Sequence, residues 1–229
     1  MPHPIVTRAE WLAARTQLLA KEKELTARAD ALATERRALP WVRVEKPYAF
    51  QSPTGPRTLA DLFGDKHQLY IYHFMFGPQA EAGCPSCSLA ADHIDRSAPH
   101  LAARDLAVAV VSRAPIAKLS AFAARMGWTF PWFSSGIGDF NADFGVTPLG
   151  GAALYNYGSE PFRTDDMHGA SIFTRGDDGA IYHTYSSFGR GIEPLLGVYH
   201  YLDVAPRGRD ESALPWPMAW VRHHDRYAP

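Results

Sequence analysis

A heptad pattern marks the start of the chain. Between Thr7 and Leu39 there is no Gly or Pro, and an apolar residue recurs every seventh position: Trp11, Leu18, Leu25, Leu32, Leu39. This spacing predicts a long helix with one apolar face. Thr7 and Glu10 have the form of a capping box, and Pro40 ends the pattern. Because a second apolar seam is poorly developed, we expect the face to pack either on the chain's own domain or on a second copy, forming a homodimer.

After Pro40 the pattern alternates between short apolar runs and amphipathic stretches. The runs predict strands at 41–45, 67–76, 106–112 and 129–133, and a hairpin at 170–174 and 180–185. A turn is expected at 51–56, an irregular stretch at 139–157. Helices are predicted at 59–63, 88–103, 115–126 and 191–202.

This order of elements predicts the fold class. Strand, helix, strand, helix, hairpin and closing helix give an α/β protein with a mixed β-sheet and flanking helices. It is the order of the thioredoxin fold, with a helical arm added in front. We expect the arm at residues 1–40, a thioredoxin-like domain at 41–205 and a packed tail at 206–229.

Composition and charge narrow the classes of partner. The 229 residues are 46% hydrophobic and 21% charged, with 23 basic against 24 acidic side chains. A nucleic-acid or anionic-membrane partner would favour a basic face, so neither is expected. The chain starts without a secretory signal pattern and has no apolar run of about 20 residues. We therefore expect a cytoplasmic protein whose thiols are kept reduced.

The two cysteines form one motif, Cys84-Pro85-Ser86-Cys87. It follows an apolar strand and a short loop, and it opens a predicted helix, where the helix dipole favours the Cys84 thiolate. Pro85 suits the first helical turn. We expect Cys84 to attack a disulfide of a small molecule or a redox protein partner, and Cys87 to resolve the mixed disulfide. No cofactor is expected for this chemistry.

The chain resembles a bacterial family of thioredoxin-like proteins of unknown function, often described by inference as dithiol-disulfide isomerases. The resemblance covers nearly the whole chain and rests on residues 8–15, 37–42, 72–77, 83–88, 112–115, 126–128, 140–141, 143–144, 183–186, 199–203 and 220–225. It implies a thioredoxin-like fold and thiol–disulfide chemistry at the dithiol.

Two departures from better-known relatives of this fold affect the expected activity. Thioredoxins place a cis-proline before the hairpin strand, whereas residues 167–172 contain no proline. Peroxiredoxins carry a Thr three residues before the reactive cysteine, and position 81 is Glu. General protein disulfide exchange and peroxidase activity are therefore less expected than a restricted substrate range.

Two further residues are candidates for a supporting role. His73 lies on the strand before the dithiol and could face the thiols, where its charge would lower the pKa of Cys84; a hydrogen-bonded core histidine is the alternative. Arg113 ends a buried strand, where it could bind a substrate carboxylate or pair with an acid.

Metal binding is the main alternative class. A zinc site needs two further ligands near the cysteines, and the chain has no other Cys. Distant side chains could still join Cys84 around copper or zinc: His183, Tyr185, Tyr199, His200, His223, His224. A metal-binding or redox-sensing module without turnover therefore stays open, as does a structural domain with incidental thiols.

Overall fold

The computed structural model describes residues 3–148 and 154–228. The chain divides into two compact units, one ending at Pro40 and the other beginning at Trp41. Both cysteines and the large sheet belong to the second unit. Part of the stretch predicted to be irregular (139–157) and the end of the predicted tail lie outside the described residues.

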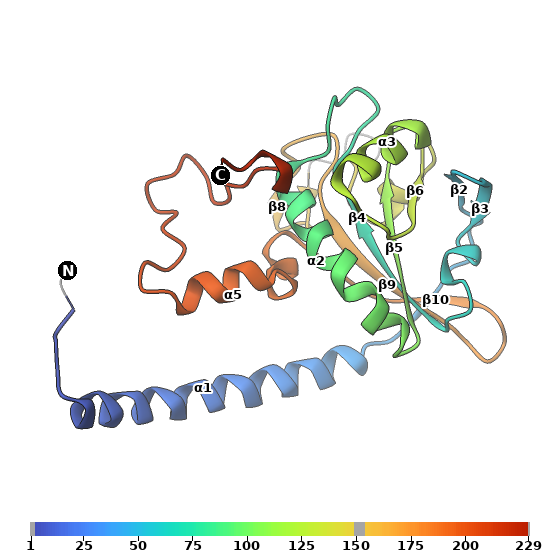
Figure 1. Cartoon of the computed structure of the whole chain (residues 1–229). Helices are drawn as coiled ribbons and strands as arrows, with labels where there is room; N and C mark the ends of the chain where they lie inside the picture. Colours follow the sequence, from blue (N-terminus) through green and yellow to red (C-terminus); the bar gives the residue numbers. More distant parts are fainter. Residues whose placement is uncertain (1–2, 149–153, 229) are drawn as a thin grey trace. The chain divides into compact units, whose positions relative to one another are not determined.

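The first unit is built on one helix, α1 (Arg8–Arg37) (Figure 1). The predicted capping box is present at its N-terminus. The Thr7 hydroxyl accepts a hydrogen bond from the Glu10 N–H, and the Glu10 carboxylate accepts one from the Thr7 N–H at 2.9 Å. No described residue of α1 is buried, so the heptad face is exposed to solvent along its length.

The second unit alternates strands and helices (Figure 1). Its helices are α2 (Pro85–Ala102), α3 (Ile116–Met126), α4 (Phe140–Asp143) and α5 (Gly197–Val204), with 3-10 segments η1 (Asp61–Phe63), η2 (Gly189–Leu195) and η3 (His224–Arg226). Its strands are β1 (Val42–Arg43), β2 (Ala49–Ser52), β3 (Gly55–Thr58), β4 (Gln68–His73), β5 (Leu106–Ser112), β6 (Trp132–Ser134), β7 (Leu154–Tyr155), β8 (Glu160–Pro161), β9 (Gly169–Arg175) and β10 (Ile181–Phe188).

Eight of these strands form one mixed sheet in the order β1-β10-β9-β4-β5-β6-β2-β3. β4 and β5 are parallel, and β9 and β10 are an antiparallel hairpin added beside β4. This arrangement of β4, α2, β5, β9, β10 and α5 is the thioredoxin-like core, and the predicted fold class is confirmed. The long helix in front of it is confirmed as well.

The sheet has an apolar core on each face. One core contains Tyr72 and Phe74 with α2, α3 and α5 packed over them. The other contains Leu69 and Ile71 with η1 and Phe140 of α4. Because successive side chains of a strand point to opposite faces, β4 contributes to both cores, as its almost continuous apolar sequence predicts.

Several predicted boundaries were wrong. The predicted last helix at 191–202 is divided into η2 and α5, because Pro194 has no N–H to donate and Leu196 leaves the helical conformation. The turn predicted at 51–56 is confirmed, and it joins the two strands of a hairpin, β2–β3, with Gly55 at φ +111°. The helix predicted at 88–103 is α2, which begins earlier, at Pro85, and continues through Pro99 to Ala102.

The C-terminal tail packs on the helices that flank the sheet. Asp225 pairs with Arg125 of α3 through both carboxylate oxygens, at 2.7 and 2.8 Å. His224 lies 2.7 Å from Asp92 of α2, which also accepts a hydrogen bond from the Trp128 indole. Charged and polar contacts thus fasten the tail to α2 and α3.

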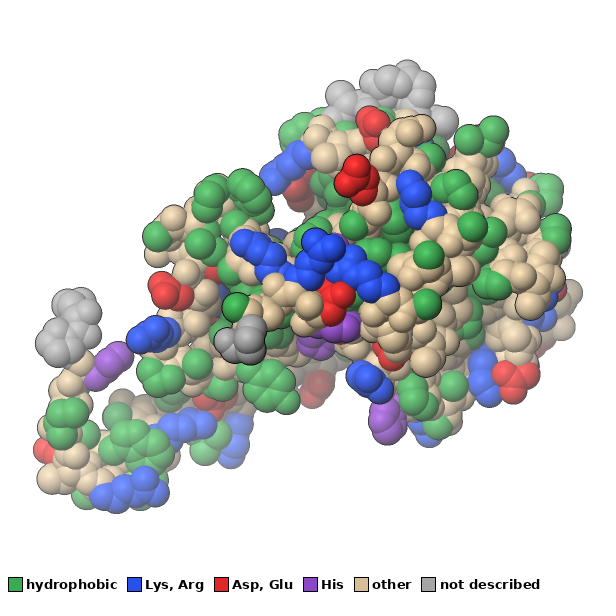
Figure 2. All heavy atoms as spheres, turned by 45° about the horizontal axis from the view of Figure 1, so that its top comes forward, with side chains coloured by type: hydrophobic (Ala, Val, Ile, Leu, Met, Phe, Trp, Pro, Cys, Tyr) green, Lys and Arg blue, Asp and Glu red, His purple; other side chains and the backbone are tan. Residues whose placement is uncertain are grey.

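The surface carries both signs of charge. On the face drawn in Figure 2, several Lys and Arg side chains gather near the centre next to an acidic side chain, and other basic and acidic side chains are scattered around them. Within residues 3–148 and 154–228, no helix is both long and apolar enough to cross a membrane.

The exposed heptad face of α1 leads to the first prediction. Replacing Leu18, Leu25 and Leu32 together with Glu should convert a dimer in solution to a monomer, because charges placed on an apolar helix interface are unfavourable. Light scattering coupled to size exclusion measures the mass.

The matched control places the same three charges on the opposite side of the helix, at Ala13, Ala20 and Ala27. That variant should keep the mass of the natural chain. A natural chain that is already monomeric, or a control that dissociates equally, would contradict α1-mediated dimerisation.

Candidate active site

The dithiol lies where the chain leaves β4 and enters α2. Cys84 is the N-cap residue of α2 and Pro85 its first helical residue, as the sequence predicts. The Cys84 N–H donates to the Met75 carbonyl at 3.1 Å, which ties the motif to the end of β4. Cys84 is half-buried, Cys87 is buried, and both are free thiols. The outer thiol can therefore meet a substrate, whereas the inner one cannot.

The two thiols differ in acidity. The Cys87 thiol contributes most to stabilising the Cys84 thiolate, and the N–H groups of Cys87 and Ser86 at the start of α2 add to this effect. Together they lower the pKa of Cys84 to about 6, although burial acts in the opposite direction. Burial and the neighbouring Cys84 raise the pKa of Cys87 well above its usual value. At neutral pH the reduced site therefore holds a nucleophilic thiolate at Cys84 and a proton on Cys87.

Tyr72 also belongs to the site, although the dithiol motif alone does not point to it. Burial raises the pKa of Tyr72, so its hydroxyl stays protonated, and its interaction with the Cys87 sulfur favours the thiolate form of Cys87. The side chain is 1% exposed. The alternation along β4 separates Tyr72 from His73, but it does not tell which of the two faces the following helix covers.

The prediction that His73 faces the thiols was wrong. Tyr72 occupies that face, so His73 points to the other side of the sheet. There its Nε2 lies 2.9 Å from the Ser171 hydroxyl, and its ring stacks on Phe140 at 5.5 Å. Burial, and then His183, lower its pKa to about 3. His73 is thus a neutral histidine of the second core, which is the alternative that the sequence left open.

Arg113 follows β5 and is engaged with acidic and backbone groups. Its Nε donates to Asp166 at 2.5 Å, and Nη2 lies 3.4 Å from the Asp165 carbonyl. The Thr147 hydroxyl donates to the same Asp166 oxygen. Of the two roles considered for Arg113, the structure therefore shows the ion pair with an acid.

The loop between β4 and the dithiol is held by contacts from α3 and from the core. Lys118 donates to the carbonyls of Pro78 and Ala80, at 2.9 and 2.8 Å. A side chain at Gly83 would collide with the Phe74 ring, since a Cβ there would lie 2.7 Å from it. These contacts fix the approach to Cys84, and neither is visible in a local motif.

His223 reaches the same loop from the far end of the chain. Its Nε2 lies 2.8 Å from the Gly83 carbonyl, and its Nδ1 lies 3.2 Å from the Arg125 guanidinium. A carbonyl can only accept a hydrogen bond, so Nε2 carries the hydrogen. A guanidinium can only donate, so Nδ1 is the acceptor and the ring is neutral. The tail thereby positions the residue directly before Cys84.

The histidines considered as metal ligands are dispersed. His183 contacts Ser186, His200 contacts the Pro194 carbonyl, and His223 and His224 make the tail contacts given above. Across the part of the chain that the structure describes, no three side chains of His, Cys, Asp or Glu come together as a metal site would require.

The fold and the N-terminal helix position of the cysteines define a thioredoxin-like protein with a half-buried and a buried thiol. The chain belongs to the family described as "Bacterial protein of unknown function (DUF899)", whose model matches residues 1–227. No protein with a curated description matches it.

Solved structures of similar fold include two peroxiredoxins. Peroxidoxin BcpB from Mycobacterium tuberculosis is 17% identical, with a TM-score of 0.49 over 72% of this chain and 97% of that one. Peroxiredoxin Q from Xanthomonas campestris is 15% identical, with a TM-score of 0.45 over 72% of this chain and 99% of that one. At these identities and TM-scores neither likeness carries an argument about the chemistry of this chain.

The contact between the thiols leads to a prediction on pH dependence. In the fully reduced protein the alkylation rate of Cys84 should rise through a midpoint near pH 6. In Cys87→Ala the midpoint should move up by about one to two pH units, because a hydrogen bond to a charged group contributes about 1.5–3 kcal/mol. Iodoacetamide kinetics followed by mass spectrometry measure both curves.

Cys84→Ala is the control, and its remaining thiol should stay unreactive at neutral pH because it is buried and weakly acidic. An unchanged midpoint in Cys87→Ala would show that the neighbouring thiol does not stabilise the Cys84 thiolate.

The tail contact gives a stability prediction. His223→Phe keeps a ring against Phe122 but leaves the buried Gly83 carbonyl without its donor, so it should lower the free energy of unfolding by about 1–3 kcal/mol. Urea unfolding measures the change. The neighbouring variant His224→Ala removes a half-exposed pair and should cost less than about 1 kcal/mol. Equal losses would argue against a specific role of His223.

Proposed function

We propose that the protein is a thiol-disulfide oxidoreductase that uses Cys84 as the nucleophile and Cys87 as the resolving thiol. The asymmetry of the pair carries the proposal. One thiol is accessible and has a lowered pKa at the start of α2, while its partner is buried and has a raised pKa. This is the division of roles that a dithiol exchange reaction requires.

The reaction runs in two exchange steps. The Cys84 thiolate attacks one sulfur of a substrate disulfide, forms a mixed disulfide and releases the other substrate sulfur as a thiolate. Cys87 then loses its proton and attacks the Cys84 sulfur, which closes the protein disulfide and releases the second substrate thiol. The substrate disulfide is reduced by two electrons, the dithiol is oxidised, and an external thiol reductant restores it.

Residues around the buried thiol support its deprotonation in the second step. The Tyr72 hydroxyl and the Met75 N–H both stabilise the thiolate form of Cys87. The Cys84 sulfur ceases to be an anion once it enters the mixed disulfide, so the charge that raises the pKa of Cys87 is removed. The resolving thiol thus becomes more acidic when it is needed.

Two features of the chain support a small or restricted substrate. The Arg113 guanidinium is engaged by Asp166, so it does not offer a free cation to a substrate carboxylate. Just before β9 the His168 carbonyl accepts a hydrogen bond from the Tyr155 hydroxyl. This backbone carbonyl therefore already has a partner within the chain. We take this as support for a range of substrates narrower than protein disulfides in general.

Trapping of the mixed disulfide tests the function. With glutathione disulfide as the probe, Cys87→Ser should accumulate a stable glutathione adduct on Cys84, because no resolving thiol remains. The natural chain should pass through this adduct to an internal disulfide and release two glutathione molecules. Intact mass spectrometry of quenched samples distinguishes these species.

Cys84→Ser is the matched variant and should form no adduct at neutral pH. Failure of Cys87→Ser to form an adduct with glutathione disulfide and with a panel of peptide disulfides would count against exchange chemistry. Equal adduct formation by both variants would show non-specific thiol reactivity.

A further inference from the structure

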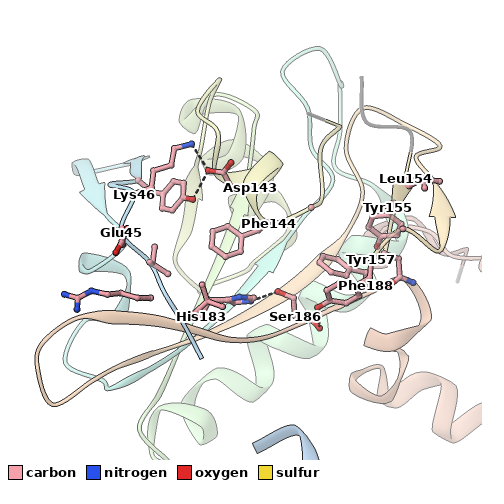
Figure 3. Close-up of a pocket in the computed structure, with 17 residues that line it drawn as sticks. Glu45, Lys46, Asp143, Phe144, Leu154, Tyr155, Tyr157, His183, Ser186 and Phe188 are labelled. Atoms are coloured by element: carbon pink, nitrogen blue, oxygen red, sulfur yellow. Dashed lines mark hydrogen bonds and ion pairs between the residues drawn. The ribbon is translucent and has the colours of Figure 1, made fainter. Parts of the chain in front are cut away.

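A second site lies on the opposite side of the sheet from the dithiol. A cavity of about 560 Å³ is formed by the chain after β1, by Phe144, by the β7–β8 turn and by β10 (Figure 3). Its volume lies within the range of small-molecule sites. None of the residues of the dithiol motif lines it, and the proposed exchange reaction does not use it.

His183 and Ser186 of β10 form the polar part of this cavity. The His183 Nε2 lies 2.8 Å from the Ser186 hydroxyl and 3.0 Å from the Tyr185 carbonyl. A carbonyl can only accept, so Nε2 carries the hydrogen and Nδ1 is the bare nitrogen. Burial lowers the pKa of His183 and keeps the ring neutral.

The same tautomer excludes a nucleophilic serine. A base for Ser186 would need a bare nitrogen facing the hydroxyl, but Nε2 carries a hydrogen. The Ser186 hydroxyl is also hydrogen-bonded to the Ser171 hydroxyl at 2.9 Å, and the Ser171 hydroxyl lies 2.9 Å from the His73 Nε2. Ser186 is therefore committed to a chain of hydrogen bonds that runs into the core.

His183 lines the cavity, and both of its hydrogen bonds are made by Nε2. Its Nδ1 has no hydrogen-bond partner among the described residues, and as a bare nitrogen it accepts a hydrogen bond. Two basic groups at the rim are paired, Lys46 with Asp143 at 2.7 Å and Arg43 with Asp178 at 3.7 Å. Glu45 also lines the cavity, so its carboxylate is a second acceptor beside the His183 nitrogen.

Aromatic rings line the cavity on both sides of His183 and Ser186. Phe144 lies edge-on to the His183 ring at 5.3 Å, while Tyr157 and Phe188 pack together at 5.2 Å beyond Ser186 (Figure 3). Tyr155 packs on Phe188 as well. Rings arranged in this way favour a planar aromatic ligand, which can make stacked or edge contacts with them.

We propose that this cavity binds a small aromatic ligand with a hydroxyl group, a phenol, whose hydroxyl donates to the Nδ1 of His183. The ring would lie against Phe144 and Tyr157. The proposal is independent of the thiol chemistry, since neither cysteine takes part.

Binding of phenol to the full-length chain tests the proposal. Phenol should cause saturable shifts in the amide resonances of β10 and of residues 154–158, and anisole, which lacks the hydroxyl hydrogen, should bind at least about tenfold more weakly, as loss of one buried hydrogen bond predicts. Two-dimensional NMR titration of the reduced protein measures both affinities.

Two variants separate the contributions of the site. His183→Phe keeps an aromatic ring without the acceptor and should abolish the preference for phenol over anisole. Tyr157→Ala changes an exposed wall residue and should weaken both probes while the preference remains. Absence of saturation up to the solubility limit, equal affinity of the two probes for the natural chain, or shifts confined to another surface would overturn the proposal.

Discussion

Burial of β4 on both of its faces is the constraint on which the rest of the structure depends. A strand in the middle of a sheet must send alternate side chains into two separate cores. Tyr72 therefore contacts the buried thiol under α2, while His73, the next residue, joins a hydrogen-bonded chain with Ser171 on the other side. Two polar environments that do not mix are thus built on adjacent residues.

The reactive thiol owes its character to several parts of the chain. The start of α2 supplies amides that favour a thiolate, and the loop that delivers Cys84 is fixed by Lys118 from α3 and by His223 from the tail. Each contact involves backbone carbonyls of the loop, so it restricts conformation and leaves the sulfur accessible. The accessible thiolate and its buried partner together support exchange with disulfides.

The cavity beside β10 has a different physical basis. Its chemistry depends on a tautomer that the Tyr185 carbonyl imposes on His183, and its walls are rings rather than charges. The dithiol and the cavity lie on opposite faces of the sheet and use no common side chain. One sheet thus carries the dithiol on one face and the cavity on the other.

Local patterns in the sequence determined the long capped helix, the central strands, the start of α2 at the dithiol and the order of elements that defines the fold. These features follow from hydrophobic periodicity, capping residues and the helix dipole, which act over a few residues. Only the tertiary structure decided that Tyr72 rather than His73 meets the thiols, that Arg113 is engaged by Asp166, and that His223 reaches the Gly83 carbonyl. The reason is physical: which face a helix covers, and which distant segments meet, depend on packing of the whole chain.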